Sequence, residues 1–193
     1  MIQPELPEPP NTPASPAFSF AYTVLHSLGS EFASLFSAKK VKMIEEDVQH
    51  FFGVYQKLSQ QALEGKDNLD KLTDLFAPQF IYSSPFGVEI GDNRDNITHL
   101  IRSKIQEMRG KGQKQIEIDS MEVIIVDEVH AMPKVTWEAT YDLNGRTVKV
   151  KYVIGYMLKY LDGVIRLYGW MATGDQDDAL RKVGIKQQNR MSL

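Results

Sequence analysis

Three stretches rich in β-branched and aromatic residues follow one another near the end of the chain, separated only by Asn144–Gly145 and Asp162–Gly163. Such dipeptides favour two-residue hairpin turns, because Asn, Asp and Gly all tolerate positive φ. A fourth stretch of the same composition precedes them. The pattern predicts an antiparallel meander with strands at 116–126, 135–143, 147–161 and 164–173.

The side chains of these strands alternate in polarity. Odd positions are apolar or aromatic in 135–143, and even positions are so in 148–160. Because successive side chains of a strand point to opposite faces, one face of the sheet is expected to cover a core and the other to face water. Val153, Gly155 and Met157 interrupt the polar face, which favours a homodimer contact near the middle of the sheet.

The first half of the domain has helical periodicity, with apolar residues three and four positions apart. Gly65 closes the first helix, and Gly87 and Gly91 are expected in turns. The predicted class is α+β. The expected order is helix 41–64, helix 69–76, strand 80–84, helix 97–108, the four long strands and a helical turn at 180–183.

The chain ends differ from the rest in composition. Six of the nine prolines lie in 1–16, which predicts an extended, disordered leader. Residues 17–38 carry an apolar stripe at helical spacing and predict an accessory amphipathic helix that covers apolar surface. We expect the folded domain at 39–185 and a flexible tail at 186–193. The acidic, proline-rich start does not fit a signal peptide, so a cytoplasmic protein without a membrane span is expected.

Composition excludes several function classes. The chain has no cysteine, and its 22 basic residues are outnumbered by 25 acidic ones, so no net positive field exists to bind nucleic acid. Neither a phosphate-binding loop nor a dinucleotide-binding glycine pattern occurs. No histidine is followed at i+3 or i+4 by a carboxylate, so no metal site is expected. We therefore expect neither a cofactor nor a metal.

Four local stretches carry a family resemblance: GKDNLDKLTDLFA (65–77), FIYSSPFG (80–87), the Gly-led start of a helix at 91–101, and DQDDALRKVGI (175–185). In this order and spacing the chain resembles the nuclear transport factor 2-like superfamily over about residues 40–185. That superfamily includes SnoaL-like cyclases, ketosteroid isomerases and scytalone dehydratases. The resemblance implies a cone-shaped, curved antiparallel sheet wrapped around the long helix. The fold alone does not define the activity.

The resemblance also identifies candidate catalytic residues. In the steroid isomerase branch an aspartate before the proline of the first strand moves a proton, but this chain has Ser84 there. A serine hydroxyl is no base near neutral pH without an activating partner. Tyr55 lies about one turn before the position of that branch's helix tyrosine. Steroid-type isomerisation is therefore disfavoured, and Tyr55, Ser84 and His99 remain as residues that could hold substrate or water.

Aromatic residues are concentrated at predicted inward positions. Buried Tyr and Trp each need a partner for a polar atom, so several phenols on one concave face favour a cavity with water or a ligand. The alternative is a plain aromatic core, since aromatic side chains suit strands. The candidate ligand-binding residues are Tyr82, Phe86, Trp137, Tyr141, Tyr152, Tyr156 and Trp170.

Three functional hypotheses follow. The first is a homodimeric protein that binds a small, mostly apolar molecule in its cavity. The second is a SnoaL-like lyase, isomerase or hydrolase that acts on a small hydrophobic substrate. The third is a non-catalytic dimerisation or interaction module with a filled interior.

Overall fold

The computed structural model describes residues 42–66, 68–85, 87–92, 94–173 and 175–185. The predicted leader, accessory helix and C-terminal tail lie outside these residues, as does the candidate residue Phe86. The helices are α3 (Glu45–Leu63), α4 (Leu69–Thr73), α5 (Arg94–Gly110) and α6 (Asp175–Lys182). The strands are β1 (Phe76–Ser84), β2 (Gly87–Gly91), β3 (Gln113–Ile125), β4 (His130–Leu143), β5 (Arg146–Leu161) and β6 (Val164–Ala172).

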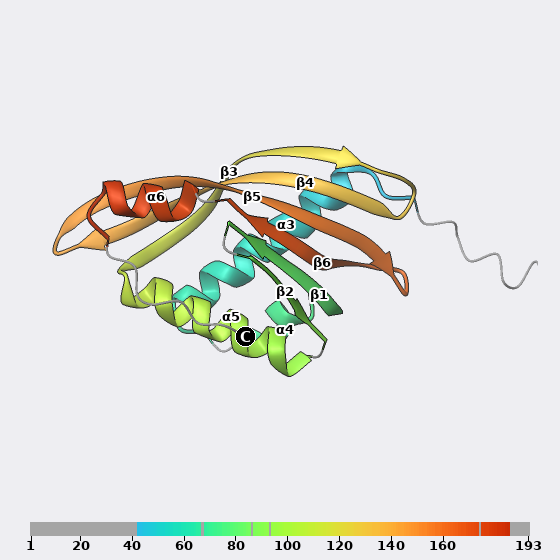
Figure 1. Cartoon of the computed structure of the whole chain (residues 1–193), viewed down its shortest axis with the longest axis horizontal. Helices are drawn as coiled ribbons and strands as arrows, with labels where there is room; N and C mark the ends of the chain where they lie inside the picture. Colours follow the sequence, from blue (N-terminus) through green and yellow to red (C-terminus); the bar gives the residue numbers. More distant parts are fainter. Residues whose placement is uncertain (1–41, 67, 86, 93, 174, 186–193) are drawn as a thin grey trace, which may run out of the picture. The chain divides into compact units, whose positions relative to one another are not determined.

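The six strands form one curved, unclosed sheet in the order β2-β1-β6-β5-β4-β3. Neighbouring strands are antiparallel except β1 and β6, which are parallel. Helices α3, α4 and α5 lie on one side of the sheet, and the long α3 runs beneath it (Figure 1). The α+β class and the curved sheet around a long helix are confirmed. We call the face toward α3 the inner face and the opposite one the outer face.

The core lies between α3 and the inner face. Val48 and Phe52 of α3 are fully buried, and the β4 positions that alternation assigned to the core are buried too. Strand β5 follows the predicted pattern in the same way. The buried inner positions of the two strands are Val135, Trp137, Ala139, Tyr141, Val150, Tyr152, Tyr156 and Leu158.

Two glutamines of α3 cover the free edge of β3. The Ile118 amide donates to Gln56 Oε1 at 2.9 Å, and the Ile116 amide donates to Gln60 Oε1 at 3.0 Å. Gln60 Nε2 in turn donates to the Lys114 carbonyl at 3.1 Å. Because an edge strand exposes backbone groups that can pair with another chain, these side chains protect this part of the edge.

Two expectations were wrong in the segment between α4 and α5. Helix α4 ends at Thr73 rather than near Phe76, and β1 begins at Phe76 and contains Pro78. The β1–β6 register shifts between Phe76 and Ile81, so the proline lies at an irregularity where no regular ladder bond is lost. Gly87 and Gly91, which were expected in turns, instead bound the short edge strand β2.

The C-terminal helix is also longer than expected. A single turn at 180–183 was predicted, whereas α6 spans Asp175–Lys182. Leu180 and Ile185 are buried in the main core, so this segment is part of the domain's packing.

Alanine substitutions at Gly91 and Gly53 are expected to change the stability of the fold in opposite directions. A Cβ on Gly91 would lie 2.0 Å from Cζ of the buried Phe80 ring, whereas no atom lies within 4 Å of a Cβ on Gly53 in α3. We expect Gly91→Ala to destabilise the fold by about 1–3 kcal/mol through overpacking. Gly53→Ala should stabilise it by about 0.5–1 kcal/mol, because alanine favours a helix. Urea unfolding of the two variants measures both; equal shifts in one direction would contradict the packing of Phe80 on Gly91.

Candidate functional site

The deepest part of the inner face is an aromatic cluster on α3, β4 and β5. Trp137 Nε1 donates a hydrogen bond to Tyr156 Oη at 2.9 Å, and both side chains are buried. The Phe52 ring centroid lies 4.9 Å from that of Tyr156 and 6.4 Å from that of Trp137. The polar atoms of Trp137 and Tyr156 thus satisfy each other within a tightly packed apolar environment.

Tyr141 is anchored by a residue that sequence reasoning missed. Its hydroxyl donates to Gln113 Oε1 at 3.1 Å, and Gln113 is itself buried at the start of β3. A polar residue at a strand end gives no sequence signal for burial, because its partner lies 28 positions away. Gln113 therefore belongs to the inner cluster as the acceptor for a buried phenol.

Four phenols of the inner face have strongly perturbed acidity. Burial raises the pKa of Tyr55 to about 12, although a hydrogen bond with Ser59 opposes the shift. Burial likewise raises the pKa values of Tyr141, Tyr152 and Tyr156. These hydroxyls therefore stay protonated near neutral pH and act as hydrogen-bond donors or acceptors, not as bases.

A stack of three rings forms the more accessible part of the inner face. The Trp170 ring of β6 stacks on Tyr82 of β1 with centroids 5.3 Å apart, and on Phe80 with centroids 5.5 Å apart. Phe80 is buried, whereas Tyr82 and Trp170 are only partly buried. Stacked planar rings that remain partly exposed suit contact with another planar or apolar group.

Tyr55 connects the stack to the deep cluster. Its ring centroid lies 6.1 Å from that of Phe76 and 6.0 Å from that of Trp137, and Phe76 lies 5.7 Å from Trp170. Ring contacts thus run without a break from the partly exposed Tyr82 to the buried Trp137. Tyr55 itself is partly buried.

The three candidate catalytic residues lie on three different elements, α3, β1 and α5. Tyr55 faces the aromatic cluster from α3. Ser84 is partly buried at the end of β1, two residues beyond Tyr82 and on the same face of the strand. His99 lies on α5 and is exposed to solvent.

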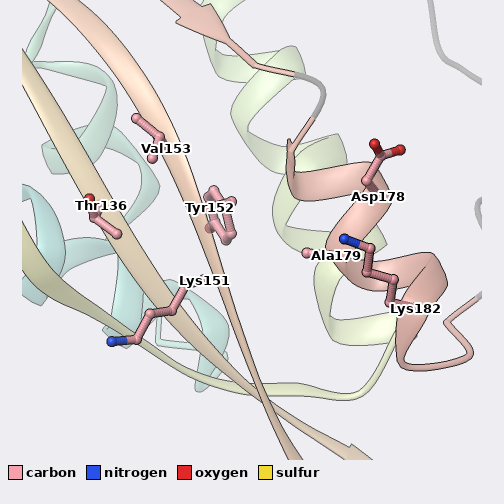
Figure 2. Close-up of a pocket in the computed structure, with 7 residues that line it drawn as sticks. All are labelled: Thr136, Lys151, Tyr152, Val153, Asp178, Ala179 and Lys182. Carbon is pink, nitrogen blue, oxygen red and sulfur yellow. The ribbon is translucent and has the colours of Figure 1, made fainter.

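Two surface hollows lie outside the ring stack. One, of about 300 Å³, lies between β5 and α6. Tyr152 points toward α6, while Lys151 and Thr136 lie on the other side of β5 (Figure 2). The other, of about 280 Å³, lies between the α3–α4 turn and α5, with Asn68 and Arg109 among its lining residues. Of these two hollows, only the one between β5 and α6 is lined by a candidate ligand-binding residue, Tyr152.

Residues 45–175 match the NTF2-like protein family DUF6841, and the chain belongs to this family. The sequence has no significant match among curated proteins. Among the described residues, no helix combines the length and hydropathy needed to cross a membrane.

Solved structures share the fold. An NTF2-like protein with a cystatin-like fold from Novosphingobium aromaticivorans is 12% identical with a TM-score of 0.55, over 74% of this chain and 88% of that one. Aln2 from a Streptomyces species is 15% identical with a TM-score of 0.54, over 74% and 98%. The β subunit of benzoate 1,2-dioxygenase from Burkholderia mallei is 11% identical with a TM-score of 0.52, over 68% and 90%. At these identities the likeness shows the cone-like fold alone.

Proposed function

We propose that this protein binds a small, mostly apolar molecule that contains a ring, at the partly exposed end of the inner aromatic face. Tyr82 and Trp170 would contact the ring, and Tyr55 would contact the part of the molecule nearer the core. The observation that carries the proposal is the unbroken series of ring contacts that begins at the accessible Tyr82–Trp170 stack.

The polar groups of this face define the expected chemistry of the ligand. The Tyr55 hydroxyl, with its pKa raised to about 12 by burial, can donate a hydrogen bond to a carbonyl or hydroxyl oxygen. Among the described residues, the buried polar side chains are Asn68, Thr73 and Gln113, with no carboxylate or imidazole. A neutral ligand is therefore favoured, because a charged one would be desolvated without a counter-charge.

The same observations favour binding over turnover. Proton transfer needs a group with a pKa near the working pH, and the phenols of this face lie well above it. His99 is exposed on α5, whereas Tyr55 is partly buried on α3. The alternative is a lyase, isomerase or hydrolase. It would require that a bound substrate place its reacting atoms next to His99 or Ser84.

Binding can be tested with a co-purified molecule and with a defined probe. Native mass spectrometry of the purified chain should reveal a bound small molecule, and 2-naphthol, a neutral ring compound, serves as the probe. We expect Trp170→Leu to weaken 2-naphthol binding, measured by calorimetry, about tenfold or more, because the ring contact is lost. The matched control is Tyr168→Leu on the same strand, where the Tyr168 ring lies near His130 instead. Absence of binding by the wild type, or equal affinities of both variants, would refute the proposal.

A further inference from the structure

The hollow between the α3–α4 turn and α5 has a basic lining. Helix α5 packs against α3 and α4 there (Figure 1). The hollow is lined by the cationic side chains of Lys66, from the turn, and of Arg102 and Arg109, from α5. The two arginines are seven residues apart in the helix, so they lie on one face of it, two turns from each other. Among the described residues that line the hollow, none is acidic.

The two arginines have no counter-charge within the described part of the chain. The acidic side chains of this region that form ion pairs do so with other cations; the pairs are Lys66–Glu64, Arg94–Asp74, Lys104–Glu107 and Lys111–Glu107. Neither Arg102 nor Arg109 forms an ion pair or a side-chain hydrogen bond with another described residue. A guanidinium stays charged throughout the physiological pH range and offers five N–H donors. Both side chains are therefore available to bind an anion.

Helix electrostatics explains only one of these arginines. Arg109 lies in the last turn of α5, where the helix dipole stabilises a cation. Its guanidinium also lies against the α3–α4 turn, since a Cβ on Gly65 would be 3.5 Å from Arg109 Nη2. Arg102 lies in the middle of the helix, where the dipole gives no such stabilisation. Like charges that share a hollow repel one another, so a bound anion would relieve this repulsion.

A buried acceptor in the same lining lacks a donor. Asn68 is 8% exposed and lines the hollow, and its Oδ1 atom has no hydrogen-bond partner among the described residues. The orientation of the amide is fixed, because Nδ2 donates to the Leu58 carbonyl at 2.9 Å and to Gln61 Oε1 at 3.2 Å. A flipped amide would set Oδ1 against the Leu58 carbonyl, which can only accept. Buried polar atoms are rarely left unpaired, so Oδ1 indicates a missing hydroxyl or N–H donor.

We propose that this hollow binds a small phosphate monoester that carries a hydroxyl group. A phosphate monoester has a charge close to −2 at neutral pH, which balances the unpaired charges of Arg102 and Arg109. Arginine is also the side chain whose planar fork best matches phosphate oxygens. The hydroxyl group would donate to Asn68 Oδ1, the acceptor that lacks a partner. This site is separate from the inner aromatic face, so the inference does not depend on the proposed ring-binding function.

The size and the remaining lining of the hollow limit the carbon skeleton of this ligand. Its volume of about 280 Å³ lies at the lower limit for small-molecule sites, which favours a skeleton of a few carbon atoms. Apolar side chains contribute the rest of the contact surface for such a skeleton; they are Ala62, Leu69 and Ile105. Glycerol 3-phosphate combines the three required features, a phosphate dianion, hydroxyl groups and a three-carbon skeleton, and is therefore the probe.

Calorimetric titration of the full chain with glycerol 3-phosphate tests the site. We expect the wild type to bind with a dissociation constant in the millimolar range or below. Arg102→Gln and Arg109→Gln should each raise this constant at least about tenfold, because each removes charge-assisted hydrogen bonds to the phosphate. The matched control is Lys104→Gln, which removes the same charge from the same helix outside the hollow and should change the constant less than about twofold. Circular dichroism checks that these variants of exposed residues keep the fold.

Three related compounds test the chemistry of the ligand without changing the protein. n-Propyl phosphate keeps the skeleton and the charge but has no hydroxyl group, so it should bind about fivefold or more weakly. L-Lactate, with a single carboxylate charge, should also bind more weakly, and glycerol should not bind. The proposal is overturned if glycerol 3-phosphate does not bind at several millimolar, or if Lys104→Gln weakens binding as much as the arginine variants do. Equal affinities for glycerol 3-phosphate and either n-propyl phosphate or L-lactate would overturn it as well.

Discussion

Replacing Trp137 with alanine is expected to lower the free energy of unfolding by about 3–5 kcal/mol, the cost of removing a large aromatic side chain from a packed core. Trp137 is 1% exposed and contacts the rings of Phe52 and Tyr55. The substitution also removes the donor to the Tyr156 hydroxyl, which is buried. Urea unfolding followed by circular dichroism measures the change.

Two further variants separate volume from hydrogen bonding. Trp137→Phe keeps most of the ring volume but leaves Tyr156 without its donor, so it should cost about 1–3 kcal/mol. Tyr168→Ala removes an aromatic ring outside this cluster and should cost clearly less than Trp137→Ala. If Trp137→Ala unfolded within about 1 kcal/mol of the wild type, the aromatic cluster would not be the core of this domain.

Raising the pH above 10 is expected to unfold the protein over a narrow range. The pKa of Tyr55 is raised to about 12, and the pKa values of Tyr141, Tyr152 and Tyr156 are raised as well, in each case chiefly by burial. Above the ordinary value of 10 the unfolded chain releases these protons while the native state keeps them. The native state then binds more protons, so stability falls with pH by about 1.4 kcal/mol per unit for each tyrosine.

Because the four groups act in the same direction, their combined loss is expected to be a large part of the stability of a typical domain. Tyrosinate absorbance and circular dichroism recorded during an alkaline titration should therefore change together for these groups. Tyr152→Phe removes one ionising hydroxyl and should shift the unfolding midpoint to higher pH, whereas Tyr168→Phe serves as the control. Ionisation of all eight tyrosines with the circular dichroism still native would show that the phenols are not buried.

The strands were predictable because their signals are local. Asn144 and Asp162 both have positive φ, 55° and 51°, as the predicted hairpin turns require. The alternation in β4 and β5 then determines which side chains face α3. These signals need no information about distant segments, so the meander and its buried face followed from the sequence.

The errors arise where tertiary contacts override local preference. Gly87 and Gly91 are typical turn residues, yet both lie in β2, and Gly91 is required there because the Phe80 ring occupies the space of a Cβ. Pro78 reads as the end of a helix, yet it lies inside β1 at a register shift. In both cases the deciding partner is another strand.

The candidate site was predictable only in its composition. Alternation correctly predicts that Trp137 and Tyr156 lie on the inner face. It does not predict the partial exposure of Tyr82 and Trp170, which depends on the curvature of the sheet and the position of neighbouring elements. The burial of Gln113 could not be predicted either, because it depends on the contact with the distant Tyr141.

The chain has two tryptophans, and both belong to the inner face, one at its accessible end and one in its depth. Indole fluorescence therefore reports on the interior of the domain alone. A molecule that enters between the rings should quench or shift this emission, whereas association through the opposite side of the sheet should leave it unchanged. The natural fluorophores can thus distinguish occupancy from self-association in a single titration, without any label.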